Sequence, residues 1–372
     1  MIPYTGEYIE HFDPEKPSLK FYSFTPRPLM RGDMYQMDDE LAALLIEAYR
    51  NIGFLEGLIK YAPNKEAFAE LMLLKECAYS RMIDYDDPDF KEILTIRGTG
   101  KGDITPITNL EMAYKAAKSM EVAAPDLSRI CGIALNGESE NNPIDVRDHQ
   151  TFWLGAKTNL KGYNPTAPDA VLPALVDISA YLYNDHNTDP LIKAALVHYQ
   201  FEMIHPFERY NGIVGRILVP MVLRDTIGEA MLLICLSEYL YHNKNEYFDL
   251  LRTTQYSGGY VRWIKFFVNA VGQVAKQSAE QLIQYEQHII EDLEHLMDIE
   301  NLPKSVFSLY EYLKRFPIIN SSTAAKNIGL SFNSISKAIR VLQEHDIVVQ
   351  ISDTERNRTW KYRAFNMDAD NI

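Results

Sequence analysis

The chain has 372 residues, of which 47% are hydrophobic and 24% charged, and its formal net charge is −14. Its length predicts two or three domains, and no apolar run approaches the roughly 18 residues of a membrane span. The negative charge disfavours binding of nucleic acid or anionic lipid by the molecule as a whole, so such binding requires a local basic patch. The first residues lack the basic and apolar regions of a signal peptide, and we expect a cytoplasmic protein with no membrane partner.

Residues 1–35 are rich in proline and aromatic residues without a clear period, and we expect an arm lying over a later domain. An acidic stretch punctuated by Pro88 predicts a loop. Apolar and polar residues alternate loosely up to Gly155, which predicts a short hairpin over 143–155, followed by a loop over 158–168. Apolar residues at helical spacing predict helices at 38–51, 65–84, 109–121, 126–134, 169–184, 189–204, 213–227, 231–242, 244–256 and 260–299.

The character of the chain changes after Pro303. Helices at 304–315, 321–329 and 331–345 precede strands at 347–351 and 359–365, which is the order of a winged helix-turn-helix. The predicted recognition helix and wing carry side chains that suit phosphate contacts: Asn333, Ser334, Ser336, Lys337, Arg340, Arg356, Arg358, Lys361 and Arg363. DNA binding, protein contact and dimerisation all remain open for this part.

The sequence therefore predicts a mainly α fold with domains at 1–108, 109–299 and 300–372. Three cysteines, Cys77, Cys131 and Cys235, lie far apart in helix-like or apolar context. We interpret them as small buried hydrophobes. No cluster of His, Cys, Asp and Glu has zinc spacing, so we predict no metal-binding residues.

One short segment carries most of the chemistry, His205-Pro206-Phe207-Glu208-Arg209-Tyr210-Asn211-Gly212-Ile213-Val214-Gly215-Arg216. Asn211-Gly212 can turn the chain and open a helix, whose first N–H groups bind anions. Arg216 lies one turn further on the same face, and its guanidinium can reach back over that site. His205 can take a proton from a hydroxyl nearby. The segment thus fits transfer of a nucleotide phosphate to a hydroxyl.

The same segment resembles the signature of the Fic (Fido) family, His-Pro-Phe-x-(Asp/Glu)-Gly-Asn-Gly-Arg-x-x-Arg. The likeness extends over most of the chain and implies a helical Fic core with a small hairpin flap, here 143–155, which aligns an extended target segment by strand addition. The family transfers AMP from ATP to a protein hydroxyl, and its members often form dimers. It implies His205 as general base and a nucleotide site at Phe207, Arg209, Tyr210, Asn211, Gly212, Gly215, Arg216 and His242.

Three positions depart from the signature. Arg209 stands where the magnesium-binding carboxylate belongs, Tyr210 replaces a glycine, and Ile213 replaces the first arginine. Because Mg²⁺ prefers carboxylate and phosphate oxygens, Arg209 puts the use of this cofactor in question. Arg209 could instead neutralise the diphosphate and make nucleotide binding independent of metal.

Many Fic proteins carry an inhibitory helix, (Ser/Thr)-x-x-x-Glu-(Gly/Asn), whose glutamate pairs with the second motif arginine. Ser80-Arg81-Met82-Ile83-Asp84-Tyr85 resembles it, with a shorter carboxylate and a bulky Tyr85. This resemblance predicts a weakened or displaced Asp84–Arg216 pair. Three alternatives remain. Asp84 could be a solvated charge, Arg216 could pair with another core carboxylate, and His205 could simply end a helix.

Two functions follow from these observations. The first is an autoinhibited adenylyltransferase that uses ATP and modifies an unidentified target protein. The alternative is a catalytically impaired Fic protein that senses nucleotide and acts as a DNA- or protein-binding regulator. The retained His205 favours the enzyme, and the three departures favour the regulator.

Overall fold

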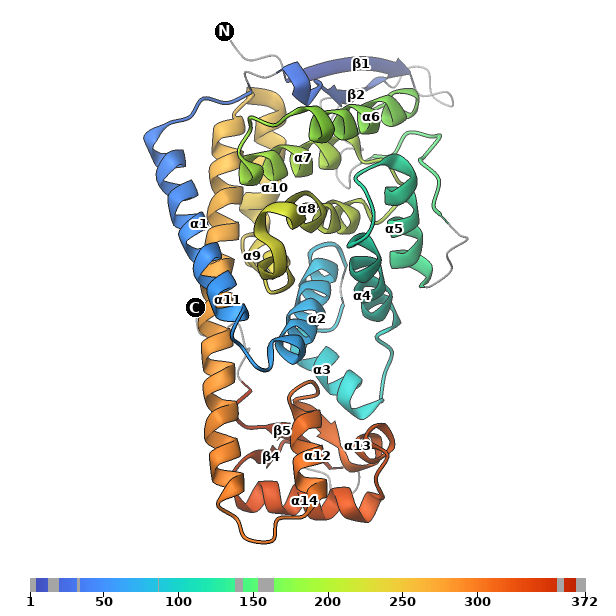
Figure 1. The fold of residues 1–372 in the computed structure, drawn as a ribbon. Coiled ribbons are helices and arrows are strands. Elements are labelled where there is room, and N and C mark those ends of the chain that lie inside the picture. Colours follow the sequence, from blue (N-terminus) through green and yellow to red (C-terminus); the bar gives the residue numbers. More distant parts are fainter. Residues whose placement is uncertain are drawn as a thin grey trace.

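The computed structural model describes residues 5–12, 20–31, 34–85, 87–137, 143–152, 164–352 and 358–365. Figure 1 shows an elongated, mainly helical molecule. The long helix α11 (Tyr260–Met297) runs along one side and joins the helical core to a smaller C-terminal module. The fold is thus mainly α, as predicted. None of the described helices combines the length and the apolar character that crossing a membrane requires.

The N-terminal residues lie against the helical core, as expected of an arm, but they form a two-stranded antiparallel ribbon that the sequence did not predict. Strands β1 (Gly6–Phe12) and β2 (Lys20–Pro26) pair along their whole length, and a short 3₁₀ turn, η1 (Leu29–Arg31), follows. The ribbon is tied to the chain before α6, because the Thr166 hydroxyl donates to the Phe24 carbonyl at 3.0 Å. This long-range pairing has no counterpart in the local sequence period.

The core helices agree with the hydrophobic pattern to within a few residues, with three exceptions: α1 extends further, α3 was missed, and the helix predicted over 231–242 is broken before Leu236. Asp89, which we placed near a loop, caps α3 by accepting a hydrogen bond from the Glu92 N–H at 2.7 Å. The core helices are α1 (Asp39–Ile59), α2 (Lys65–Asp84), α3 (Phe90–Thr99), α4 (Thr105–Ala117), α5 (Ala124–Asn136), α6 (Pro168–Asn184), α7 (Pro190–Ile204), α8 (Asn211–Ile227), η3 (Gly228–Leu232), α9 (Leu236–His242) and α10 (Lys244–Ser257).

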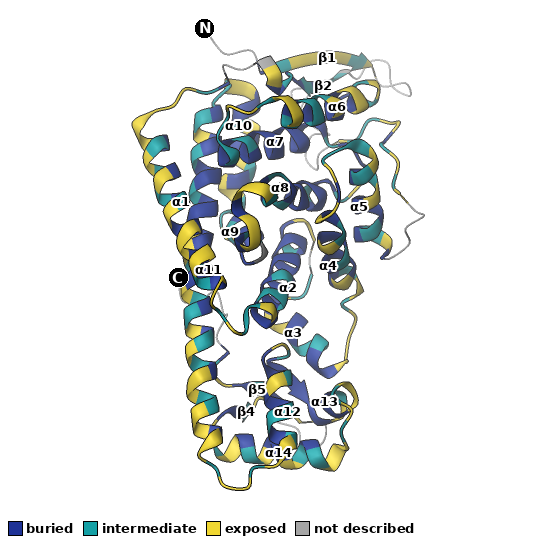
Figure 2. Ribbon diagram, in the orientation of Figure 1, coloured by how far each residue is buried: buried dark blue, intermediate teal, exposed yellow. Residues whose placement is uncertain are grey.

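Helices α7 and α8 lie in the centre of the core. They are buried along most of their length, as Figure 2 shows by their dark colour. A helix that is apolar on all sides is covered on all sides, and α7 is covered by α6, α8, α11 and β2. The turn between α7 and α8 therefore starts from two well-fixed ends.

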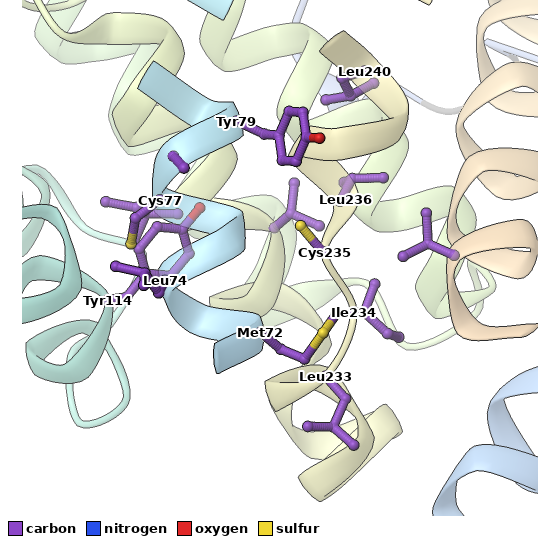
Figure 3. Packing of buried hydrophobic residues seen from close by; sticks show 14 of the residues in the cluster. Met72, Leu74, Cys77, Tyr79, Tyr114, Leu233, Ile234, Cys235, Leu236 and Leu240 are labelled. Carbon is purple, nitrogen blue, oxygen red and sulfur yellow. The ribbon is translucent and has the colours of Figure 1, made fainter. Parts of the chain in front are cut away.

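Helix α2 packs between α4 and α9, and its contacts are both apolar and charged. Figure 3 shows Met72, Leu74, Cys77 and Tyr79 of α2 among side chains of the neighbouring helices, including Tyr114 and Leu236. Lys75 and Glu238 form a buried ion pair at 2.7 Å. Glu76 accepts hydrogen bonds from the Tyr114 hydroxyl at 2.7 Å and the Ser237 N–H at 2.8 Å. All three cysteines are buried and free, as predicted.

The C-terminal module contains α12 (Lys304–Leu313), β3 (Ile318–Asn320), α13 (Ser321–Ile328), α14 (Phe332–Glu344), β4 (Val348–Gln350) and β5 (Thr359–Tyr362). The strands form one antiparallel sheet in the order β3-β5-β4. The order of helices and wing strands agrees with the prediction, while β3 was not expected. The module packs on α3, where the Asn320 side chain donates to the Thr99 carbonyl at 2.9 Å.

The predicted hairpin over 143–155 is not seen in its described part. Residues 143–152 contain no strand, and residues 153–155 lie outside the described residues. The Arg147 side chain binds carbonyl groups of this segment and of the end of α7, whereas the predicted hairpin would have bonded to a second strand.

Candidate functional site

The turn between α7 and α8 has an unusual backbone at both ends. His205 ends α7 with a φ of 52°, and Tyr210 precedes α8 with a φ of 69°, both in the left-handed region. Asn211 closes the turn: its Oδ1 accepts from the Phe207 N–H at 2.8 Å, and its Nδ2 donates to the Phe207 carbonyl at 2.8 Å. The Phe207 ring is fully buried. Phe207 and Asn211 therefore fix the backbone of the turn on its buried side.

His205 is positioned by Arg147, a residue that the sequence did not single out. The Arg147 Nε donates to the His205 carbonyl at 2.7 Å, and its Nη2 donates to the Ile204 carbonyl at 3.2 Å. Burial, together with the positive charge of Arg147, lowers the pKa of His205 to about 4. The imidazole is therefore neutral at neutral pH and able to accept a proton.

The predicted anion site at the start of α8 is covered by a carboxylate of the chain itself. A β-carbon placed on Gly212 would lie 2.8 Å from Asp84 Oδ2 and 2.9 Å from Arg216 Nη1. Only glycine leaves this space open. Since helix N-termini favour negative charge, the Asp84 carboxylate lies where the sequence predicted a phosphate.

Arg216 is buried, and the end of α2 provides its partners. Its Nη2 donates to Asp84 Oδ2 at 2.5 Å and to the Ser80 carbonyl at 2.8 Å, while its Nε donates to Ser80 Oγ at 2.8 Å. The Arg216 side chain is 1% exposed and that of Asp84 is 26% exposed. We expected a weakened or displaced pair, but the pair is formed. The close approach of α2 to α8 compensates for the shorter side chain of aspartate.

Next to this pair, Arg81 connects the end of α2 to the motif turn. Its guanidinium donates to the Tyr210 hydroxyl, binds Asp87 Oδ2 at 2.5 Å, and lies 4.2 Å from the centre of the Tyr85 ring. The rings of Tyr85 and Tyr210 are 5.6 Å apart. We call these four residues, Arg81, Tyr85, Asp87 and Tyr210, the latch. The latch uses Tyr210 and Tyr85, two of the departures from the family patterns.

Polar side chains of α7 contact the motif helix α8 on its buried side. Burial raises the pKa of Glu202 to about 8, so this carboxyl is largely protonated at neutral pH. Any side chain on Gly215 would collide with Glu202. Gly215 therefore lies in the α7–α8 interface, and its carbonyl accepts from His198 Nδ1 at 2.9 Å. His198 is a fully buried core residue.

An open pocket of about 820 Å³ adjoins Asp84. It is lined by the end of α2, including Tyr85, and by the junction of α9 and α10, including Tyr241 and His242. The His242 ring also lies 5.6 Å from that of Tyr79. His242, predicted from the sequence to contact nucleotide, thus lies on the same pocket as Asp84.

The three departures from the signature have different environments. Arg209 is exposed, Tyr210 belongs to the latch, and Ile213 is completely buried. The described residues contain no group of three or more metal-ligating side chains. With a guanidinium at position 209 and an exposed Glu208 beside it, the residues present do not fit a magnesium site.

Some site residues could not be found from the motif. Arg147, Arg81 and Glu202 carry no signature of their own, and each acts through a partner that is distant in the sequence or on an adjacent helix. Glu202 could have been suspected from the sequence, because burying a carboxylate in an otherwise apolar helix is costly unless it has a partner.

Comparison with known proteins places this site in a family. Residues 124–223 match the model of the Fic/DOC family. The chain is 38% identical over 64 residues to protein adenylyltransferase fic-1 of Caenorhabditis briggsae, covering 16% of this chain and 12% of that protein. It is 30% identical over 115 residues to the probable protein adenylyltransferase aq_aa38 of Aquifex aeolicus (strain VF5), covering 31% of this chain and 32% of that protein. The matches thus span a third or less of these relatives.

The whole fold has a relative among solved structures. A Fic family protein from Desulfovibrio desulfuricans G20 superposes with a TM-score of 0.57 at 16% identity, covering 91% of this chain and 100% of that one. At this identity the likeness concerns the fold alone. It extends well beyond the residues of the family match.

Proposed function

Since the chain belongs to the Fic family, we propose that it is a protein adenylyltransferase that transfers AMP from ATP to a protein hydroxyl and is inhibited by its own α2. One observation carries this proposal. The anion site at Gly212, the buried Arg216 and the neutral His205 lie on one turn, and the Asp84 carboxylate covers the anion site.

The proposed reaction uses this chain's residues as follows. The target hydroxyl attacks the α-phosphate of ATP, so a new P–O bond forms while the bond to the β-phosphate breaks and pyrophosphate leaves. His205 takes the proton of the hydroxyl, because its low pKa keeps Nδ1 and Nε2 from both being protonated. Gly212 and Arg216 hold the phosphates through the helix N-terminus and a charged hydrogen bond.

Inhibition follows from competition between two anions. The polyphosphate of ATP and the Asp84 carboxylate both require Arg216 and the space over Gly212. Nucleotide therefore binds fully only when the end of α2 moves. The latch opposes this movement, because Arg81 bonds to Tyr210 of the motif turn itself.

We propose that nucleotide binding is independent of magnesium. Arg209 is exposed beside the turn and carries the positive charge that the metal supplies when bound in other members of the family. The pocket beside Asp84, with His242 and Tyr85 on its walls, is large enough to receive the base and ribose.

A second candidate function is a nucleotide sensor with impaired catalysis. It is favoured by the latch, by the buried Ile213 where the family has an arginine, and by the cation at position 209. In this case nucleotide would still displace Asp84, but no transfer would follow. Both candidates bind nucleotide, but only the enzyme transfers AMP to a protein.

The test is ATP labelled in the α-phosphate, added to wild type, Asp84→Asn and His205→Ala with and without Mg²⁺, in the presence of a bacterial lysate that supplies hydroxyl acceptors. We expect labelled protein with Asp84→Asn, less with wild type and none with His205→Ala. Intact mass spectrometry of the purified variants checks for self-modification by one AMP. Nucleotide binding is measured in parallel by calorimetry.

The outcomes separate the candidates. Nucleotide binding without label in any sample supports the sensor and contradicts the enzyme. Label that persists in His205→Ala contradicts the role of the histidine. Absence of nucleotide binding in Asp84→Asn contradicts both candidates.

A further inference from the structure

A second polar pocket lies in the C-terminal module, outside the site described above. It has a volume of about 280 Å³ and is formed between the start of α13, one side of α14 and strand β5. Its walls include Ser321 and Ser322, Ser336 and Arg340, and Arg358 and Trp360. Hydroxyl, guanidinium and indole groups from three elements thus converge on one hollow.

The donors of this pocket lack acceptors. Trp360 is only 8% exposed, and its Nε1 has no hydrogen-bond partner within the described residues. An indole N–H can only donate, and a buried donor without an acceptor is costly. Ser321 and Ser322 begin α13, whose cap residue Asn320 bonds the Thr323 N–H at 2.7 Å and thus serves only one of the first amides. The hollow is therefore suited to an anion.

The charge of this region points the same way. Arg340 and Arg358 are exposed and have no carboxylate partner among the residues that the structure describes, whereas Arg363 is paired with Asp346 at 3.1 Å. Residues 321–343 contain no Asp or Glu. Residues 301–372 contain ten Lys and Arg and seven Asp and Glu, although the whole chain has a net charge of −14.

The pocket is also placed where a large ligand can reach it. In Figure 1 the module forms one end of the molecule, and α14 lies along that end, away from the core. Figure 2 shows exposed positions along α14. Asn333, Lys337 and Arg340 of this helix are exposed. A regular row of polar and basic side chains beside an anion pocket suits a polymer of phosphates better than a single phosphate group.

We propose that this pocket binds a backbone phosphate of duplex DNA, with α14 lying against the duplex. Arg340 and Arg358 provide the charge, and the Trp360 N–H and the start of α13 orient the phosphate oxygens. Phosphate contacts of this kind fix the position of a protein on DNA and carry no sequence information. This inference does not depend on adenylyltransferase activity.

The experiment measures binding of the full chain to a fluorescent 30-base-pair duplex of random sequence by anisotropy, between about 50 and 200 mM salt. We expect Arg340→Gln and Arg358→Gln each to weaken binding about three- to tenfold and to lower the salt slope by about one. Trp360→Phe should weaken binding without changing the slope, because it removes a donor but no charge. Arg315→Gln is the matched control, since Arg315 pairs with Glu70 at 3.5 Å outside the pocket and its replacement changes the net charge equally.

Thermal melting of each variant confirms that it is folded. The proposal is overturned if the wild type does not bind the duplex at the lowest salt, or if Arg315→Gln weakens binding as much as the two pocket variants. A phosphoserine peptide pool tested in the same way provides the remaining arm. Binding of the peptides but not of the duplex, with the same sensitivity to Arg340 and Arg358, would show that the pocket reads phosphorylated protein and would also overturn it.

Discussion

Replacing Asp84 with asparagine removes one negative charge from the nucleotide site and keeps the size of the side chain. In the structure this carboxylate accepts a 2.5 Å hydrogen bond from an arginine that is 1% exposed. Hydrogen bonds that involve a charged group contribute about 1.5–3 kcal/mol. Because ATP must displace this carboxylate from Arg216, its loss should tighten nucleotide binding by about tenfold to more than a hundredfold.

The same change should destabilise the protein without nucleotide. Arg216 would keep its two bonds to Ser80 but lose its charged partner, and we expect unfolding to become easier by about 1–3 kcal/mol. Saturating ATP should restore this stability, since a ligand that binds only the folded state stabilises it. Calorimetry gives the affinity, and thermal melting with and without ATP gives the stability.

Glu121→Gln is the control for this experiment. Glu121 pairs with Arg224 at 2.7 Å, but its side chain is 76% exposed, and Arg224 lies in the last turn of α8 whereas Gly212 lies in the first. We expect this variant to leave ATP affinity unchanged. If Asp84→Asn binds ATP no more tightly than wild type, the competition between carboxylate and phosphate is refuted.

Three further predictions concern the surroundings of the site. Gly212→Ala should abolish the gain in ATP affinity when combined with Asp84→Asn, because its β-carbon lies 2.9 Å from Arg216 Nη1; retained affinity would refute the anion site. Tyr210→Phe removes the acceptor of Arg81 and should raise ATP affinity a few-fold; unchanged affinity in calorimetry would show that the latch is irrelevant to inhibition. Burial lowers the pKa of His198 to about 4 in the folded protein. As the pH falls, this histidine is therefore protonated first in the unfolded chain, and its contribution should lower the free energy of unfolding by about 3 kcal/mol between pH 7 and pH 4. Urea unfolding should show a weaker pH dependence in His198→Gln, and an identical dependence would contradict this assignment.

The proposed competition at Gly212 gives one departure from the family signature, Tyr210, a part in inhibition. Tyr210 occupies a left-handed position that costs a residue with a side chain about 1–2 kcal/mol. The bonds of the latch offset this cost only while α2 is docked. A tyrosine at this place therefore ties the shape of the motif turn to the position of α2, which a glycine would not do.

The helices of the core were predictable because each one is recorded in a local pattern of apolar residues. Helix α2 begins and ends where that pattern does, and the turn at Asn211-Gly212 opens α8 as expected. The errors occurred where a distant partner decides the structure. Strand β2 is bonded to Asn164 and Thr166, about 140 residues away, and β3 pairs with β5 some forty residues later in the chain.

The site shows the same division. The proposed chemistry rests on twelve consecutive residues, because a base, a turn and an arginine one helical turn apart are brought together by the helix itself. The state of the site could not. Asp84 and Arg216 are 132 residues apart, Arg81 and Tyr210 are 129 apart, and Arg147 reaches His205 across 58 residues.

The sequence alone thus identified the residues that we propose to bind phosphate and accept a proton. Only the tertiary structure decided that the phosphate site is covered, since this depends on how closely α2 packs against α8. That distance is set by the packing of α2 between α4 and α9, and by the buried pairs of Lys75 with Glu238 and Glu76 with Ser237. Local periodicity records which face of a helix is buried but not which partner covers it, or at what depth.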